Sequence, residues 1–232
     1  MRFDRPVVGG IPDMIDNTTN LYEGNLRYYF QILFFEAKNV LNPGHNFRHM
    51  NHVGWMTYTA CKYYARYRKF TPRQMRTLII AALFHDFNHF GKKINDKINI
   101  TEALRALKER LLPEDQPYWS EIERLVWSTE HPYTSPSKDL PLDAKILRDA
   151  DMSQVLEVAW IQQIVFGFAA EWGDEPIEVL RKQIPFLENL RFYSSWGQRR
   201  YPQSAIDAKK AESKWLLAIL EADVGRTPVT VS

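Results

Sequence analysis

"TPRQMRTLIIAALFHDFNHF" (residues 71–90) is the stretch that decides the predicted fold. Thr71 is a suitable helix N-cap, and Pro72 fits the first helical position, where its missing N–H costs no hydrogen bond. The apolar residues after Pro72 predict a helix buried in a protein core. We expect Gly91, directly after this stretch, to end the helix.

Apolar residues recur at helical intervals over most of the remaining chain, and no stretch alternates with the period of a strand. The first twenty residues (1–20) contain Gly-Gly and two prolines without a helical period, so we expect an irregular N-terminal arm. No linker divides the rest of the chain. The sequence therefore predicts an all-α fold, a single-domain helical bundle over residues 21–225 with a C-terminal tail at 226–232. Besides the helix quoted above, we expect helices at 21–40, 47–70, 99–111, 118–129, 143–170, 175–190 and 203–223.

The composition is that of an ordinary globular protein, with 45% hydrophobic residues among 232 and a net charge of +2. This near-neutral balance gives no reason to expect binding to nucleic acid. The longest apolar run, "LIIAALF" (78–84), is too short to cross a bilayer, so we expect no membrane role. The single cysteine, Cys61, cannot form an internal disulfide, and no secretory leader opens the chain, so we expect a cytoplasmic protein. The sequence does not indicate an oligomeric state.

Histidines and acids interrupt the apolar helix patterns at a few places. His45 and His49 are four residues apart, which places them on one face of a helix. His85 and Asp86 follow the buried run, and two aspartates stand between apolar residues in "ILRDADMSQV" (146–155). A histidine, a His-Asp pair and a distant aspartate supply the nitrogen and oxygen ligands that suit Zn, Mn, Fe or Mg. The sequence therefore predicts a divalent-metal site.

The order of these residues resembles the four-ligand signature of the HD-domain metal-dependent phosphohydrolases, an all-helical superfamily. The signature is His49, then His85-Asp86 after a small and apolar run, then Asp151 within "DAD". The resemblance covers roughly residues 25–165. It implies that these four residues bind one or two divalent ions.

Shorter motifs are similar to those of the class I cyclic nucleotide phosphodiesterases within that superfamily. The matching stretches are "HNFRH" (45–49), "HDFNH" (85–89), the Thr-Glu of "WSTEH" (127–131) and "ADMS" (150–153). The Gln and Phe that hold a purine in that family, three residues apart, are similar to Gln183 and Phe186 in "KQIPF". The resemblance implies a small nucleotide substrate whose phosphoester is hydrolysed, with a cyclic phosphodiester as the specific case.

The segment after His89 departs from the phosphodiesterase pattern. The chain is shorter than those catalytic domains, and it lacks the second histidine pair that they usually carry here. In its place, Lys92 and Lys93 could bind phosphate oxygens, and Glu102 could join the shell of a second ion. His89 itself stands where the nucleotidase branch of the superfamily has a nearby Glu, which weakens a simple 5′-nucleotidase interpretation.

Phosphoester hydrolysis needs a nucleophile, charge neutralisation at phosphorus and a proton for the leaving oxygen. We expect Asp86 to bridge two ions, because a carboxylate offers two oxygens. Water molecules would supply most of the ligands of the second ion, and Glu102, Glu130 or His131 would lie behind these waters. His45, outside the ligand set, is the expected general acid, because the ordinary pKa of an imidazole, about 6.5, suits proton release at neutral pH.

Supporting roles are expected for neighbouring residues. His89 is expected to take part in catalysis, and Asn46 to cap the helix that carries His49. Asp149 either orients a ligating histidine or is an ordinary charge on a helix surface. The segment "YSSWGQRRYPQ" (193–203) is either a basic lip over the substrate or an ordinary loop.

Other functions remain compatible with the same residues. A nucleotide phosphatase or dNTP hydrolase would use the same ligand set. An iron-dependent oxygenase of the same superfamily would use additional histidines, for which His89 and His131 are available. A nucleotide sensor without turnover would bind metal and ligand only.

Overall fold

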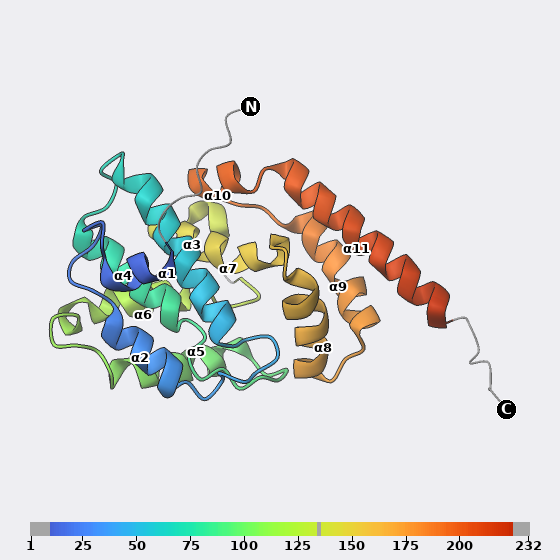
Figure 1. Cartoon of the computed structure of the whole chain (residues 1–232), viewed down its shortest axis with the longest axis horizontal. Coiled ribbons are helices and arrows are strands. Elements are labelled where there is room, and N and C mark those ends of the chain that lie inside the picture. Colours follow the sequence, from blue (N-terminus) through green and yellow to red (C-terminus); the bar gives the residue numbers. More distant parts are fainter. Residues whose placement is uncertain (1–9, 134–135, 225–232) are drawn as a thin grey trace.

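The computed structural model describes residues 10–133 and 136–224, and all of their regular structure is helical (Figure 1). Within these residues there is no strand, which confirms the predicted all-α fold. No helix among them is long and apolar enough to cross a membrane. The α-helices are α1 (Ile11–Asp16), α2 (Arg27–Phe35), α3 (Phe47–Ala65), α4 (Pro72–Phe84), α5 (Asp96–Lys108), α6 (Trp119–Trp127), α7 (Leu142–Met152), α8 (Gly167–Trp172), α9 (Pro176–Asn189), α10 (Ser195–Arg200) and α11 (Gln203–Val224).

Helix α4 forms the centre of the core, as its sequence predicts. Thr71 caps it through a capping box, in which the Thr71 hydroxyl accepts from the Gln74 N–H and the Gln74 side chain accepts from the Thr71 N–H at 2.8 Å. Every residue from Leu78 to Phe84 is at most 1% exposed. A helix that is apolar and buried all round must be covered on every side, and α3, α6 and α7 pack against it.

Helix α4 ends at Phe84, before the predicted stop at Gly91, and the His-Asp pair lies in the turn directly after it. Asn39 tethers this turn. Its Nδ2 donates to the carbonyl oxygen of Asp86 at 2.9 Å, and its Oδ1 accepts from the Asn88 N–H at 3.0 Å. Asn88 has a left-handed φ of 64°, a conformation that asparagine tolerates and that a helix cannot continue through.

The N-terminal prediction needs two corrections. The expected irregular arm is wrong for residues 11–16, which form α1. The helix expected from residue 21 begins only at Arg27, because the chain first turns through Gly24 at a φ of 66°. Asn17 holds this loop, since its Nδ2 donates to the carbonyl oxygen of Gly24 at 2.8 Å. The predicted tail at 226–232 lies outside the described residues.

The C-terminal half differs from the prediction at two places. The single helix expected over 143–170 is divided into α7, a 3₁₀ turn (η3, Ser153–Leu156), a π-helical turn (η4, Ile161–Phe166) and α8. The 193–203 segment is neither a loop nor a lip over the site. It contains α10, which packs against α3 and α7.

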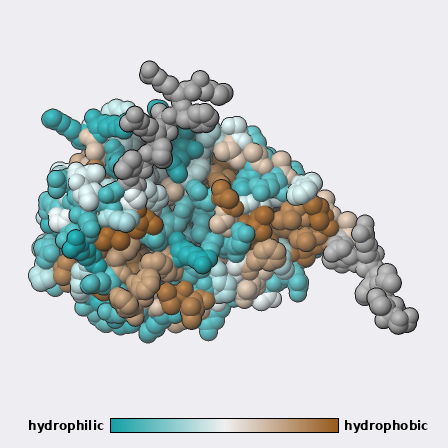
Figure 2. Space-filling model, in the orientation of Figure 1, coloured by the Kyte–Doolittle hydropathy of each residue, from teal (hydrophilic) through white to brown (hydrophobic). Residues whose placement is uncertain are grey.

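Helices α8, α9 and α11 lie together beside the α3–α4–α7 core (Figure 1). Helix α9 packs along α11 on one side and against η4 and α8 on the other. Apolar residues gather on the surface over the outer end of this layer (Figure 2). On α11, Trp215 and Ile219 are exposed. The side of the layer that faces the core closes one wall of a cavity.

Candidate metal centre

A cavity of about 490 Å³ lies between the core and the α8–α9 layer. Its lining comes from α3, the turn after α4, the 91–95 loop, α7, η4, α8 and α9. The four predicted metal ligands and the residues predicted for catalysis or substrate binding line it, namely His45, His49, His85, Asp86, His89, Lys92, Lys93, Asp151, Gln183 and Phe186. The fold therefore brings all of these residues into one place, although their roles stay predictions.

The four predicted metal ligands converge at the buried end of the cavity. His49 Nε2 lies 3.1 Å from His85 Nε2 and is 3.2 Å from both Asp86 Oδ2 and Asp151 Oδ1. His85 Nε2 is 3.3 and 3.5 Å from the same two oxygens. His49, His85 and Asp151 form a group whose ligand atoms could hold a metal ion. Asp86 Oδ2 lies within 3.3 Å of both rings, so the four residues offer two nitrogens and two carboxylate oxygens to a divalent ion.

Both histidines are oriented through their other ring nitrogen. His49 Nδ1 is hydrogen-bonded to Gln154 Oε1, and His85 Nδ1 donates to the carbonyl oxygen of Ala82 at 2.8 Å. With the proton on Nδ1, each ring presents the Nε2 lone pair to the cluster, which is the usual arrangement of metal-binding histidines. The sequence analysis did not identify Gln154.

The charges of the cluster also favour a cation. Burial opposes charging of the rings, but the two aspartates outweigh it and raise the pKa of His49 to about 9 and that of His85 well above its usual value. Burial likewise opposes charging of the acids, yet the histidines hold the pKa values of Asp86 and Asp151 below their usual range. The two carboxylates thus attract positive charge, which a divalent ion in place of ring protons would supply.

His45 lies beside this cluster and is held by Glu171 of α8, a residue that the sequence analysis missed. Glu171 Oε1 is 2.5 Å from His45 Nδ1, and Oε2 accepts from the N–H groups of Gly44 and His45 at 2.8 Å each. The Glu171 side chain is fully buried. Its only sequence signal is an acid inside the otherwise apolar "FAAEW".

The imidazole of His45 is stacked between two other rings. His89 lies 4.0 Å away on one face and Phe168 4.9 Å away on the other, measured between ring centroids. Burial and the neighbouring His45 lower the pKa of His89 to about 4, so this ring is neutral at pH 7. His45, His89 and Glu171 could also hold an ion, but both oxygens of Glu171 already accept hydrogen bonds. The geometry therefore favours an oriented imidazole at His45.

Three residues predicted to support the site lie elsewhere. Glu102 faces Arg105 and accepts from Asn88 at 3.1 Å, outside the cavity, and Glu130 does not line the cavity either. Asp149 does not orient a ligating histidine, because its carboxylate accepts from backbone N–H groups at the start of α10. Of the predicted residues behind a second ion, only His131 lines the cavity. Asn46 caps α3 as predicted, accepting from two backbone N–H groups.

The wall opposite the cluster is apolar and aromatic. Phe186 of α9 and Trp172 of α8 line it, and Trp172 stacks on Phe168 at 4.5 Å. Gln183 is buried here, and its Nε2 has no hydrogen-bond partner among the described residues. An unpaired buried amide is costly unless a ligand satisfies it.

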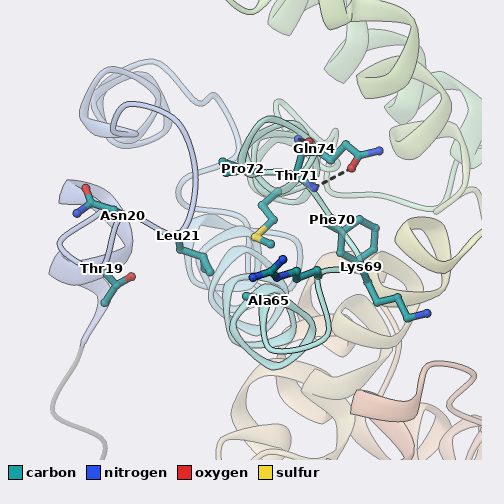
Figure 3. A pocket seen from close by; sticks show the side chains of 11 residues that line it. Thr19, Asn20, Leu21, Ala65, Lys69, Phe70, Thr71, Pro72 and Gln74 are labelled. Carbon is teal, nitrogen blue, oxygen red and sulfur yellow. Dashed lines mark hydrogen bonds between the residues drawn. The ribbon is translucent and has the colours of Figure 1, made fainter.

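A second pocket of about 580 Å³ lies where α3 ends and α4 begins (Figure 3). The side chains that line it include neither a histidine nor an acid among the described residues. Thr71 and Gln74, at the start of α4, are hydrogen-bonded to each other, as the dashed line in Figure 3 shows. This pocket therefore lacks the groups that the first cavity offers for chemistry.

A scan of the chain against protein-family models found no matching family, and searches of curated proteins and of solved structures found no match either. The geometry and chemistry of the cavity are thus the basis for assigning a function.

Proposed function

We propose that this protein is a metal-dependent phosphohydrolase that cleaves a nucleotide phosphoester, of the HD-domain type that its sequence resembles. The observation that supports this proposal best is the convergence of His49, His85, Asp86 and Asp151 at the closed end of a ligand-sized cavity. A cyclic nucleotide phosphodiester is the substrate that the shorter motifs favour.

The four converging residues would hold the metal. Divalent ions bound there would neutralise phosphate charge and activate the attacking water. His49 and His85 contribute Nε2, because Gln154 and a backbone carbonyl occupy their Nδ1 atoms. As a carboxylate, Asp86 has a second oxygen with which to reach a second ion.

His45 is suited to give the leaving oxygen its proton. Glu171 accepts from His45 Nδ1, so the proton available for transfer is the one on Nε2. The rings of His89 and Phe168 on either face fix the plane of the imidazole. His89 would thus contribute to catalysis by holding His45, since a neutral ring with a low pKa is a poor proton donor at pH 7.

The aromatic wall is suited to a nucleobase. Phe186 and Trp172 offer flat apolar faces, and the unpaired Nε2 of Gln183 is a donor for an acceptor on the base edge. These residues stand opposite the metal ligands in the same cavity, as a nucleotide with its phosphate at the metal would require.

Asp86→Ala is the decisive variant. It should lose both bound metal and hydrolysis, whereas Asp207→Ala, an exposed change on α11, should keep both. Metal content is measured by elemental analysis. Hydrolysis is measured on a panel of cyclic mononucleotides, nucleoside mono- and triphosphates and dinucleotides. Full activity of Asp86→Ala, or oxygen consumption by the iron-loaded protein without phosphate release, would refute the proposal.

A further inference from the structure

Two lysines from different walls of the cavity share one carboxylate. Lys93, in the loop after the α4 turn, lies 2.6 Å from Asp174 Oδ1. Lys182, on α9, lies 2.8 Å from Asp174 Oδ2. Both lysines line the cavity, and Asp174 lies in the turn between α8 and α9. The two ammonium groups are thus arranged around two oxygens of a single anion.

This part of the cavity carries more positive than negative charge. Lys92 also lines it and forms no ion pair within the described residues. Asp174, Asp96 and Glu178 are the acids nearby. Asp96 accepts from the backbone N–H of His131 at 2.8 Å, and Glu178, a charged neighbour of Lys182, is ion-paired with Arg181 at 2.5 Å. With Glu178 balanced by Arg181, three ammonium groups face the carboxylates of Asp174 and Asp96, so an additional anion would be attracted here.

The lysines lie at the open end of the cavity, away from the metal ligands. The side chains of Lys93 and Lys182 are 53% and 57% exposed, whereas those of His85 and Asp86 are 2% and 13% exposed. One cavity therefore has the proposed metal ligands at its closed end and a cluster of positive charge at its mouth.

We propose that Lys93 and Lys182, assisted by Lys92, bind a second phosphate group of the substrate, and that Asp174 occupies this subsite until the substrate displaces it. A phosphate presents two oxygens as a carboxylate does, with as much charge or more. Asp174 follows Gly173, whose φ is 66°, and its backbone N–H donates to the carbonyl oxygen of Ala169 at 3.0 Å, so displacement of the carboxylate needs only a rotation of the side chain. The inference rests on the proposed function and narrows its substrate to a nucleotide with two phosphate groups, such as a cyclic dinucleotide.

Binding of inorganic pyrophosphate to the full chain, stripped of metal with a chelator, tests the subsite without catalysis. Lys182→Ala should weaken binding about fivefold, the upper range for an exposed ion pair. Asp174→Asn should strengthen it by a similar factor, because a competing anion is removed. Lys214→Ala, on α11 outside the cavity, is the control and should bind as the parent protein does. Weaker binding by Asp174→Asn, or equal binding by all three variants, would overturn the inference.

Hydrolysis provides a second readout. Lys182→Ala should raise KM for a cyclic dinucleotide more than for a cyclic mononucleotide, shifting the ratio of the two kcat/KM values about fivefold. An equal fall for both substrates would overturn the inference. Absence of hydrolysis with the expected changes in pyrophosphate binding would refute the phosphohydrolase proposal and support the anion subsite.

Discussion

Replacing Glu171 by Gln should slow hydrolysis of substrates with a poor leaving group by about 10- to 150-fold. The carboxylate accepts three hydrogen bonds, two from backbone N–H groups and one from His45 Nδ1. Burial alone would raise the pKa of Glu171, but the hydrogen bonds from His45 and these N–H groups lower it, so the residue is ionised at pH 7. The side-chain amide of the Glu171→Gln variant has only one acceptor oxygen and is uncharged. The protonated His45 thus loses a charge-assisted bond, worth about 1.5–3 kcal/mol.

The assay compares two phosphodiesters that differ in their leaving group. A nitrophenolate leaves without protonation, so its release should change by less than about threefold. An alkoxide must be protonated as it leaves, which is the role proposed for His45, so its release should show the whole loss. Metal content should stay at the parental level, since Glu171 is not among the four converging ligands. Glu188→Gln, an exposed change on α9, is the control.

Equal losses on both substrates would refute the reasoning, because Glu171 would then support the structure and not proton transfer. Unchanged rates on the alkoxide substrate would refute it as well. A pH–rate profile distinguishes a role of Glu171 in proton transfer from a purely structural role. Only the loss of its contact with His45 would move the limb of the profile that reports the general acid.

Three further perturbations test other parts of the structure. Metal binding at pH 7 should release at least one proton per protein and weaken as the pH falls, because the pKa of metal-free His49 is raised to about 9. Calorimetry in buffers of different ionisation enthalpy measures the number of protons released. Binding without proton release would contradict the prediction. Burial raises the pKa of Asp149 from 3.8 to about 6, so the folded state keeps a proton that the unfolded state loses, and this group should lower stability by about 3 kcal/mol between pH 4 and 7. Asp149→Asn should remove that part of the pH dependence in urea unfolding, and parallel curves for both proteins would exclude the effect. Gly44→Ala should lower the free energy of unfolding by about 1–3 kcal/mol, because a Cβ at this position would overlap a ring carbon of Phe168. Thermal unfolding measures the change. A Tm equal to that of the parent protein would show that the loop at Gly44 and α8 can move apart without cost.

Local signals were sufficient for most of the helices. The capping box at Thr71 and the cap at Asn46 lie where the sequence predicts them, because a cap depends on residues within one turn of each other. The end of α4 was not predictable in this way. It depends on Asn39, which is bonded to the turn after α4 from 47 residues away in sequence.

The same distinction between local signals and contacts that are distant in the sequence applies to the site. The sequence by itself indicated which histidines and aspartates lie together in the cavity and could bind a metal, because such side chains are costly to bury in an apolar helix without a partner. It could not indicate Glu171, which lies 126 residues after His45. Nor could it indicate that Lys93 and Lys182 would share Asp174 across the cavity mouth. Caps and periodicity are properties of a few consecutive residues, whereas these contacts exist only once whole helices have packed together, so only the tertiary structure decides them.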